Sequence, residues 1–154
     1  MQAHKQKSVK EVFPAMFKPS TSVPKFGEIR LGCAPQDHAL LGTHKYVGIH
    51  PYLVVSNDVY NKFSGQCDVI PFTTKRFSSA SPTHVNYQAG SIRGLTRDST
   101  LVVEARDTLL NSQLSEPIAR FSDENWQLAK KAFLTQNPFL TRWVIPEPRP
   151  TPVA

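Results

Sequence analysis

Residues 50–75, HPYLVVSNDVYNKFSGQCDVIPFTTK, decide the fold that we expect for this chain. Residues 52–55 are an apolar run without alternation, which is the pattern of a strand covered on both faces. Ser56 is the expected N-cap of a short helix that closes near Gly65. A second apolar strand follows over 66–72, and the proline within it predicts a sheet edge or a bulge. The stretch therefore predicts two buried strands joined by a helical turn.

Short extended segments also dominate the rest of the chain. Residues 26–33 alternate like a half-buried strand with Ile29, Leu31 and Cys33 on one face. Further strands are expected over 84–87, 101–110 and 116–121. Helices do not alternate with these strands, which excludes a doubly wound parallel sheet. We therefore expect a mainly β (α+β) fold, with a strongly bent antiparallel sheet or small barrel.

One segment, 122–136, has a clear helical pattern. Ser122 is its expected N-cap, and two acidic residues follow it at the positive end of the helix dipole. Trp126 and Phe133 lie on its apolar stripe, so we assign them to docking the helix on the sheet. The Asn-Pro pair at 137–138 ends the helix.

The composition bounds the class of protein. A chain of 154 residues with 40% hydrophobic content is long enough for one domain with a buried core. Its formal charge of +6 favours a polyanionic or acidic partner. Cys33 and Cys67 have no companion at metal-ligand spacing, so we expect two reduced thiols. No signal-peptide pattern and no membrane-length apolar run is present, which predicts a soluble, cytoplasmic protein.

The two ends differ in composition from the middle. Residues 1–26 are rich in lysine and proline without a sustained period, which indicates a basic arm lying on the domain. Residues 141–154 are proline-rich and predict an extended tail. Residues 27–140 between them form the expected domain.

Thr73, Thr74 and Lys75 stand side by side where a buried strand runs out. Two hydroxyls and a cation suit a phosphate, and strand ends usually carry functional groups. The alternative is structural, because threonine suits strands and a Lys-Arg pair suits a solvated turn.

The order of these pieces resembles the PemK/MazF family of toxins, the ribonuclease members of bacterial toxin–antitoxin pairs. The matching pieces are GEI at 27–29, HPYLVVSNDVYN at 50–61, GQCDVIPFTT at 65–74, GL at 94–95, VVEARDTLL at 102–110 and IARFSDENWQLAKKAF at 118–133. The residues that agree in order and spacing are Pro51, Ser56, Tyr60, Asn61, Gly65, Pro71, Thr73 and Thr74. The resemblance covers roughly residues 27–136. It implies a small SH3-like β-barrel of PemK/MazF type with the C-terminal helix packed on it.

The resemblance also implies an activity, cleavage of single-stranded RNA by attack of the 2′-OH, without metal or cofactor. Family members use an arginine before the strand proline together with the first threonine of the pair. This chain keeps Thr73 and has His50 in place of that arginine. An acidic residue that some members use aligns with Glu104. The implied catalytic set is therefore His50, Thr73 and Glu104.

Other groups are expected to hold RNA or partners. The expected RNA contacts are Thr74, Lys75, Arg76, Lys45 and Arg93, with Arg97 as a further phosphate candidate. The resemblance implies three partners, namely mRNA, an acidic antitoxin segment and a second copy of the chain in a homodimer.

The change at position 50 leaves several interpretations open. An imidazole is a better acid or base at neutral pH than a guanidinium, but it is a poorer permanent cation. His50 is alternatively a strand residue without a chemical task, and Glu104 alternatively pairs with Arg106 at the surface. The loss of the arginine also leaves open a catalytically inactive RNA- or protein-binding module. A gyrase-poisoning toxin ranks third, because the chain ends in PRPTPVA and lacks the C-terminal aromatic residue of that toxin.

Overall fold

The computed structural model of the chain describes residues 17–34, 48–74, 80–142 and 152–153. The strands in this part are β1 (Glu28–Ala34), β2 (Gly48–Val54), β3 (Gln66–Thr73), β4 (His84–Tyr87), β5 (Ser99–Val102), β6 (Asp107–Leu110) and β7 (Leu114–Arg120). The helices are α2 (Asp58–Ser64) and α3 (Asp123–Gln136), and the 3-10 turns are η2 (Val103–Ala105), η3 (Asn111–Gln113) and η4 (Pro138–Arg142).

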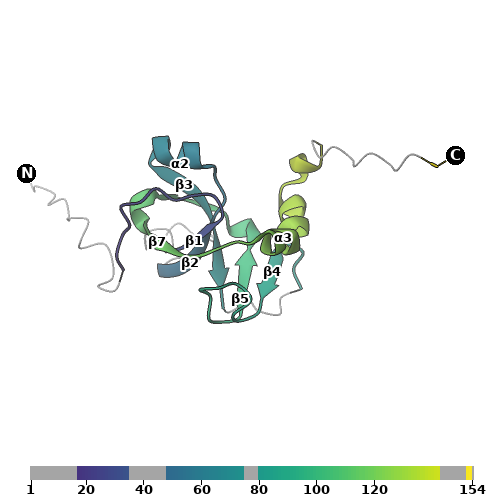
Figure 1. The fold of residues 1–154 in the computed structure, drawn as a ribbon, viewed down its shortest axis with the longest axis horizontal. Coiled ribbons are helices and arrows are strands. Elements are labelled where there is room, and N and C mark those ends of the chain that lie inside the picture. The colour runs from purple at the N-terminus through teal and green to yellow at the C-terminus, as the bar shows by residue number, and fades with distance from the viewer. Residues whose placement is uncertain (1–16, 35–47, 75–79, 143–151, 154) are drawn as a thin grey trace, which may run out of the picture.

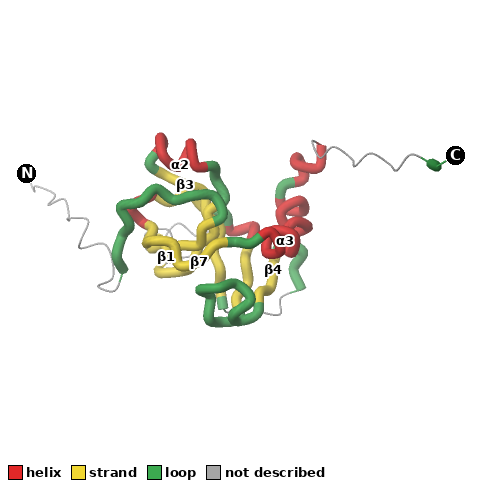
Figure 2. Tube along the Cα trace, viewed as in Figure 1, coloured by secondary structure: helices red, strands yellow, loops and turns green. Residues whose placement is uncertain are grey.

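The strands form one antiparallel sheet (Figures 1 and 2). Their order is β4-β5-β3-β2-β1-β7, and β6 pairs with β3 outside this path. β4 and β7 are the two ends of the order, so the sheet is not closed by hydrogen bonds into a barrel. The predicted mainly β fold of SH3-like barrel type is confirmed, with this gap between its edges.

β3 is the strand that organises the sheet. Residues 66–69 pair with β6, and Phe72 and Thr73 pair with β5. Pro71 lies between these two partners, where β3 faces neither of them in register. The predicted irregularity at this proline is therefore a change of partner strand inside the sheet, and Pro71 itself is buried. A residue without a backbone N–H suits a position where the ladder is interrupted.

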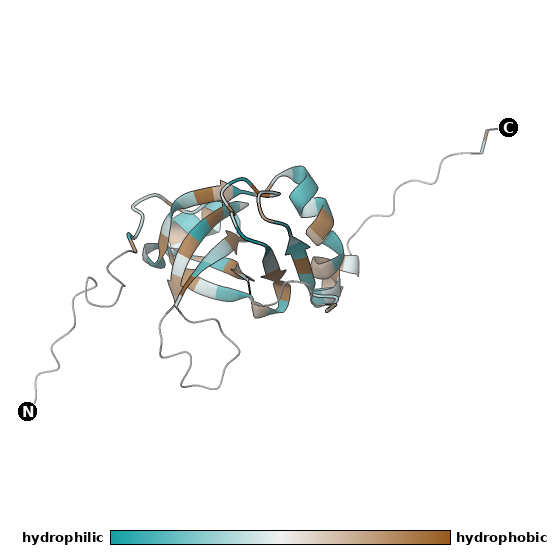
Figure 3. Cartoon of the chain, turned by 90° about the horizontal axis from the view of Figure 1, so that it is seen from below, coloured by the Kyte–Doolittle hydropathy of each residue, from teal (hydrophilic) through white to brown (hydrophobic). Residues whose placement is uncertain are grey.

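Two apolar clusters form the core. β2 shows how they are divided, because Leu53 belongs to the cluster under α3 whereas Tyr52 and Val54 belong to the other. Successive side chains of a strand point to opposite faces, so a strand between two clusters is apolar without alternation. The predicted double-sided burial of this run is confirmed, and Figure 3 shows apolar and polar residues interleaved along other parts of the strands.

α3 packs on the sheet as predicted. Ser122 is its N-cap, where the Ser122 hydroxyl accepts a hydrogen bond from the Asn125 N–H at 3.2 Å. Trp126 and Phe133 pack against the cluster under the helix, and the Trp126 ring meets the Phe121 ring edge-on at 4.9 Å. The helix ends at Asn137, as the Asn-Pro pair predicts.

The cap of α2 was predicted one residue early. Asn57 is the N-cap, and its side chain accepts from the Tyr60 N–H at 2.8 Å. The Ser56 hydroxyl instead donates to Asn61 and accepts from the Asp68 N–H at 2.9 Å. Serine and asparagine are both preferred N-cap residues. The hydroxyl of Ser56 is engaged in hydrogen bonds to α2 and β3, and Asn57 is therefore the cap.

Two further strand predictions are corrected. β1 is covered on both faces rather than half-buried, and Leu31 is less buried than its neighbours Arg30 and Gly32. The expected long strand over 101–110 is divided into β5 and β6 by η2. This break accompanies the change of partner along β3, since β5 and β6 pair with different parts of that strand.

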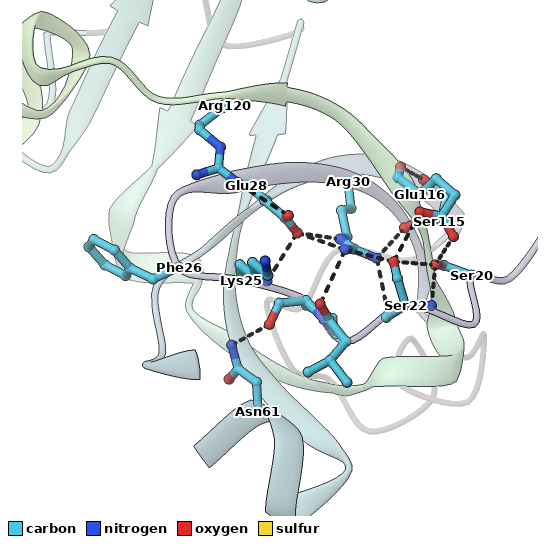
Figure 4. Close-up of polar contacts among 12 residues, drawn as sticks. Ser20, Ser22, Lys25, Phe26, Glu28, Arg30, Asn61, Ser115, Glu116 and Arg120 are labelled. Atoms are coloured by element: carbon cyan, nitrogen blue, oxygen red, sulfur yellow. Dashed lines mark hydrogen bonds and ion pairs between the residues drawn. The ribbon is translucent and has the colours of Figure 1, made fainter. Parts of the chain in front are cut away.

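The second face of β1 carries a buried ion pair between Glu28 and Arg30 (Figure 4). Arg30 is 1% exposed, and its Nη2 lies 2.7 Å from Oε2 of Glu28, which is 5% exposed. The Arg30 guanidinium also donates to the Ser115 carbonyl at 3.0 Å and to the Ser22 hydroxyl at 3.1 Å. Such a pair is tolerated in a core when further hydrogen bonds satisfy both ions.

These contacts tie residues 17–26, the described part of the expected N-terminal arm, to the domain. The Ser20 N–H donates to the Leu114 carbonyl at 2.8 Å, beside the start of β7. The Ser22 hydroxyl donates to Glu116 Oε2 at 2.9 Å. At the other end of the segment, the Phe26 ring stacks on Trp126 with centroids 4.8 Å apart. The segment therefore connects β7 to α3 across the edge of the sheet.

Cys33 and Cys67 are both buried and free, in agreement with the prediction. Burial, followed by the neighbouring Asp68, raises the pKa of Cys67 to about 12. In the described part of the chain, no helix is long and apolar enough to cross a bilayer.

Candidate active site

A pocket of about 400 Å³ lies where β2 and β3 run toward the loop between β4 and β5. Its polar lining groups are His50, Thr73, Thr74, Thr96, Arg97 and Ser99. Its remaining walls are Leu31, Ile49, Pro51, Phe72, Gly94, Leu95 and Ile118. The pocket thus combines an imidazole, hydroxyls and a guanidinium above an apolar floor.

The strand register brings His50 and Thr73 together. β2 and β3 are antiparallel, and their last recorded pair is Tyr52 with Pro71. The recorded pairing ends there, two residues from His50 on β2 and two residues from Thr73 on β3, and both of these residues line the pocket. The pairing of β2 with β3 therefore carries one residue from each of the two family motifs into the same pocket.

The loop over 88–98 forms the opposite wall. Leu95 is buried, and the Gly90 N–H donates to the Leu95 carbonyl at 3.0 Å. Asp98 closes the loop by accepting from the Ala89 N–H at 2.7 Å. The Ser99 hydroxyl donates to the Arg97 carbonyl at 2.9 Å. These bonds fix the backbone that carries Thr96 and Arg97 into the pocket.

Gly94 allows this loop to touch β7. Its φ is +100°, and a Cβ built on it would lie 2.2 Å from the Ile118 carbonyl oxygen. Gly94→Ala should therefore destabilise the protein by more than about 1 kcal/mol, measured by chemical denaturation. Gly90→Ala is the matched control, because Gly90 has a φ of +79° but open space around its Cβ. Equal losses in the two variants would show that contact with Ile118 is not the cause.

The predicted RNA contacts fall into three groups. Thr74 lines the pocket. Arg93 is exposed on the same loop but does not line the pocket, whereas Arg97 does. Lys45, Lys75 and Arg76 lie outside the described residues.

Glu104 is not brought to this pocket. It belongs to η2, beyond the end of β5 that lies away from Thr73. Its carboxylate bonds to His84 and accepts from the Thr83 hydroxyl at 2.8 Å. Arg106, the expected surface partner of Glu104, instead pairs with Asp68. Glu104 therefore belongs to a separate cluster with Thr83 and His84.

The lowered pKa of Glu104 predicts that the contacts of Glu104 with Thr83 and His84 stabilise the protein in a pH-dependent way. Partial burial raises the pKa, but hydrogen bonds from its own backbone, Thr83 and His84 outweigh burial and hold the pKa below its usual value. A group whose pKa is lower in the folded than in the unfolded state stabilises the folded protein at pH values above the unfolded-state pKa. This contribution is lost as the pH falls through the folded-state pKa. Glu104→Gln should therefore lower the Tm near neutral pH, with a difference from wild type that shrinks on acidification.

The side chain of Glu104 is 39% exposed, so solvent screening limits this effect to within about 1 kcal/mol. Thermal melts of both proteins between about pH 7 and pH 3 measure it. A difference that stays constant over this range would contradict the role of the ionised carboxylate.

Several family-motif residues serve the fold rather than the pocket. The Ser56 hydroxyl donates to Asn61, which is fully buried. The Asn61 amide in turn donates to the Pro24 carbonyl at 2.9 Å. This chain of bonds fixes α2 between β2, β3 and residues 17–26. Ser56 and Asn61 are therefore structural in this protein.

Most of the pocket residues that sequence reasoning missed form the walls of the pocket. Leu31, Ile49 and Ile118 come from three strands, and Thr96 and Gly94 from one loop. No local pattern distinguishes an apolar wall residue from a core residue. Only the register of β1, β2 and β7 identifies them.

A second hollow, of about 460 Å³, lies beside α3 and has a different character. Aromatic rings line it, including Phe26, Trp126 and Phe139. Phe26 and Phe139 are exposed. Exposed apolar surface of this kind is typical of a contact with another protein rather than of phosphate chemistry.

The chain is similar to known proteins in both sequence and fold. The profile of the family described as "PemK-like, MazF-like toxin of type II toxin-antitoxin system" matches residues 36–136. The chain is 34% identical over 77 residues to endoribonuclease EndoA of Bacillus subtilis, covering 50% of this chain and 66% of EndoA. It is 29% identical over 85 residues to endoribonuclease MazF of Staphylococcus saprophyticus, covering 55% and 70%. The matched segments thus span about two-thirds of these relatives.

Solved structures agree in fold. MazF from Deinococcus radiodurans superposes with a TM-score of 0.59 at 20% identity, over 76% of this chain and 98% of that chain. A mycobacterial endoribonuclease in complex with its cognate antitoxin gives a TM-score of 0.56 at 20% identity, over 75% and 95%. Because the family profile matches residues 36–136, more than half of the chain, the chain belongs to the PemK-like, MazF-like toxins of type II toxin–antitoxin systems.

Proposed function

We propose that this protein is a toxin that cleaves single-stranded RNA, without a metal, at the pocket formed by β2, β3 and the loop over 88–98. The observation that carries the proposal is that His50 and Thr73 line that pocket together. The two groups come from the two motifs shared with a family whose named relatives are endoribonucleases. Retention of the fold alone would not support an activity, so the site residues carry the argument.

The reaction assigns a task to each of the two residues. The 2′-oxygen attacks the adjacent phosphorus, a 2′-O–P bond forms, and the bond from phosphorus to the 5′-oxygen breaks. One proton leaves the 2′-OH and one is delivered to the departing 5′-oxygen. His50 transfers one of these protons. Thr73 donates a hydrogen bond to a phosphate oxygen, and the products carry a 2′,3′-cyclic phosphate and a 5′-OH.

The burial of Thr73 supports its task. Thr73 is 5% exposed at the end of a central strand, paired with Thr100 of β5. A hydroxyl held in this way is preorganised, because the strand and its neighbours fix its position before the substrate binds. Thr74, the next residue, is exposed and reaches the same pocket, where it would contact the RNA backbone.

The partners follow from charge and from the family. The formal charge of +6 suits mRNA as substrate and an acidic segment of an antitoxin as inhibitor. Lys45, Lys75 and Arg76 are further RNA contacts that the sequence proposes. The exposed aromatic surface beside α3 suits a protein partner, and we assign the protein to a homodimer in the cytoplasm.

The test is cleavage of a long single-stranded RNA in the presence of EDTA, with mapping of the new ends. Discrete cuts with a 5′-OH and a cyclic phosphate are expected from the wild type. Thr73→Val, which keeps the shape of the side chain and removes the hydroxyl, should lower the rate by about 10²-fold. Intact RNA after incubation with folded protein, purified free of antitoxin, would contradict the proposed function.

A further inference from the structure

The pocket needs a permanent positive charge that His50 does not guarantee. Attack on a phosphodiester adds negative charge at the phosphorane oxygens, and fixed donors or cations stabilise it. An imidazole that transfers a proton is neutral in part of the catalytic cycle. During that part of the cycle the side chain at position 50 carries no charge. The charge must therefore come from another side chain near Thr73.

Arg97 is the one lysine or arginine among the described residues that line the pocket. It reaches the pocket from the loop over 88–98, opposite the strand ends that carry His50 and Thr73. A guanidinium keeps its charge at neutral pH and presents a planar fork that matches two phosphate oxygens. Arg97 therefore has the permanent positive charge that the side chain at position 50 lacks.

The loop holds Arg97 in place from both sides. The Arg97 carbonyl accepts from the Ser99 hydroxyl, and Asp98 accepts from the Ala89 N–H across the loop. Leu95 is buried against the main core, two residues before Arg97. A loop backbone fixed in this way loses less conformational entropy when Arg97 binds a phosphate.

We infer that Arg97 is a catalytic residue that binds the non-bridging oxygens of the scissile phosphate and stabilises the charge of the transition state. His50 is then left to transfer protons, so two residues divide the tasks of the missing arginine. This inference rests on the proposed function, because it names the phosphate of a bound RNA as the ligand of Arg97.

Single-turnover cleavage at saturating RNA tests the inference with Arg97→Gln and Arg97→Lys. Arg97→Gln should lower the rate by about 10²- to 10³-fold, and Arg97→Lys should recover part of the loss. Arg142→Gln, which removes the same charge from η4, should cleave at the wild-type rate. Thermal melts confirm that each variant is folded.

A second readout separates a chemical role from a structural one. With His50→Arg in place, a guanidinium stands at the family position, and the loss caused by Arg97→Gln should fall to about tenfold or less. The same variants are also tested for binding of a fully 2′-O-methylated RNA, which cannot be cleaved by 2′-OH attack. Arg97→Gln should weaken this binding more than Arg142→Gln does.

The outcomes are distinguishable. Cleavage by Arg97→Gln at the rate of Arg142→Gln would overturn the inference and leave the proposed function standing. Binding without cleavage by the wild type, weakened by Arg97→Gln, would support Arg97 as the phosphate contact and contradict the proposed activity. A wild type that neither cleaves the RNA nor binds the methylated RNA would overturn both.

Discussion

Replacing His50 by Ala should lower the single-turnover rate of RNA cleavage by about 10²- to 10⁴-fold, the range typical of losing a general acid or base. The variant should remain folded, because His50 is a half-buried residue at a strand end that lines the pocket. RNA affinity should change much less than the rate, since proton transfer contributes to the transition state and not to the bound ground state.

The pH–rate profile gives this prediction its sharpest form. A residue that transfers a proton makes the rate depend on pH, so the wild-type profile should have a limb that belongs to the residue at position 50. His50→Arg, which restores the residue of the family pattern, should remove this limb while keeping measurable cleavage. A wild-type profile that is flat through neutral pH and unchanged in His50→Ala would show that His50 takes no part in proton transfer.

Replacing Arg30 by Met should lower the free energy of unfolding by about 3–5 kcal/mol, because it leaves the buried Glu28 carboxylate without its main counter-ion. The Ser115 carbonyl and the Ser22 hydroxyl lose a donor in the same change. Residues 17–26 should then dissociate from β7, since Arg30 is their central contact (Figure 4). Denaturant unfolding gives the stability, and protease sensitivity near Ser22 reports the release of the segment.

Arg120→Gln is the matched control for this change. Arg120 contacts the other oxygen of the same carboxylate at 3.4 Å, but its side chain is 63% exposed. An exposed ion pair contributes at most about 1 kcal/mol, so this variant should be nearly as stable as wild type. Arg30→Met combined with Glu28→Leu should recover much of the lost stability, because no buried charge is then left unpaired. Equal losses for Arg30→Met and Arg120→Gln would contradict the buried pair.

The fold could be predicted where a local pattern and its tertiary surroundings agree. Tyr52 to Val54 is apolar on both faces and is buried on both faces. α3 has a serine cap, an apolar stripe and an Asn-Pro stop, and each of these signals acts within one or two turns of the helix. These elements were therefore predicted correctly from short stretches of sequence.

The errors lie where distant contacts decide the structure. β1 reads as half-buried because it carries Glu28 and Arg30, and no local pattern shows that these two charges pair inside the domain. The same reason places the cap of α2 on Asn57, since Ser56 is occupied by Asn61 and Asp68. The strand expected over 101–110 breaks at η2 because its two halves, β5 and β6, pair with different parts of β3.

The site was predictable to a similar extent. The resemblance named His50 and Thr73, and both of them line one pocket in the structure. Sequence spacing does not distinguish Arg93 from Arg97, because both stand on one loop and only the fold of that loop decides which one lines the pocket. Glu104 aligned with a family acid but bonds to Thr83 and His84, so alignment alone did not locate its side chain.

Attack by a ribose 2′-OH in this pocket is the step that the proposed function requires. It is tested with two oligonucleotides in EDTA, an RNA with one mapped cleavage site and the same RNA with a single 2′-deoxy nucleotide on the 5′ side of that bond. We expect the first to be cut, and the second to stay intact at this bond while it binds with similar affinity. Cleavage of the deoxy-substituted bond would rule out attack by the 2′-OH, because no 2′-oxygen is then present.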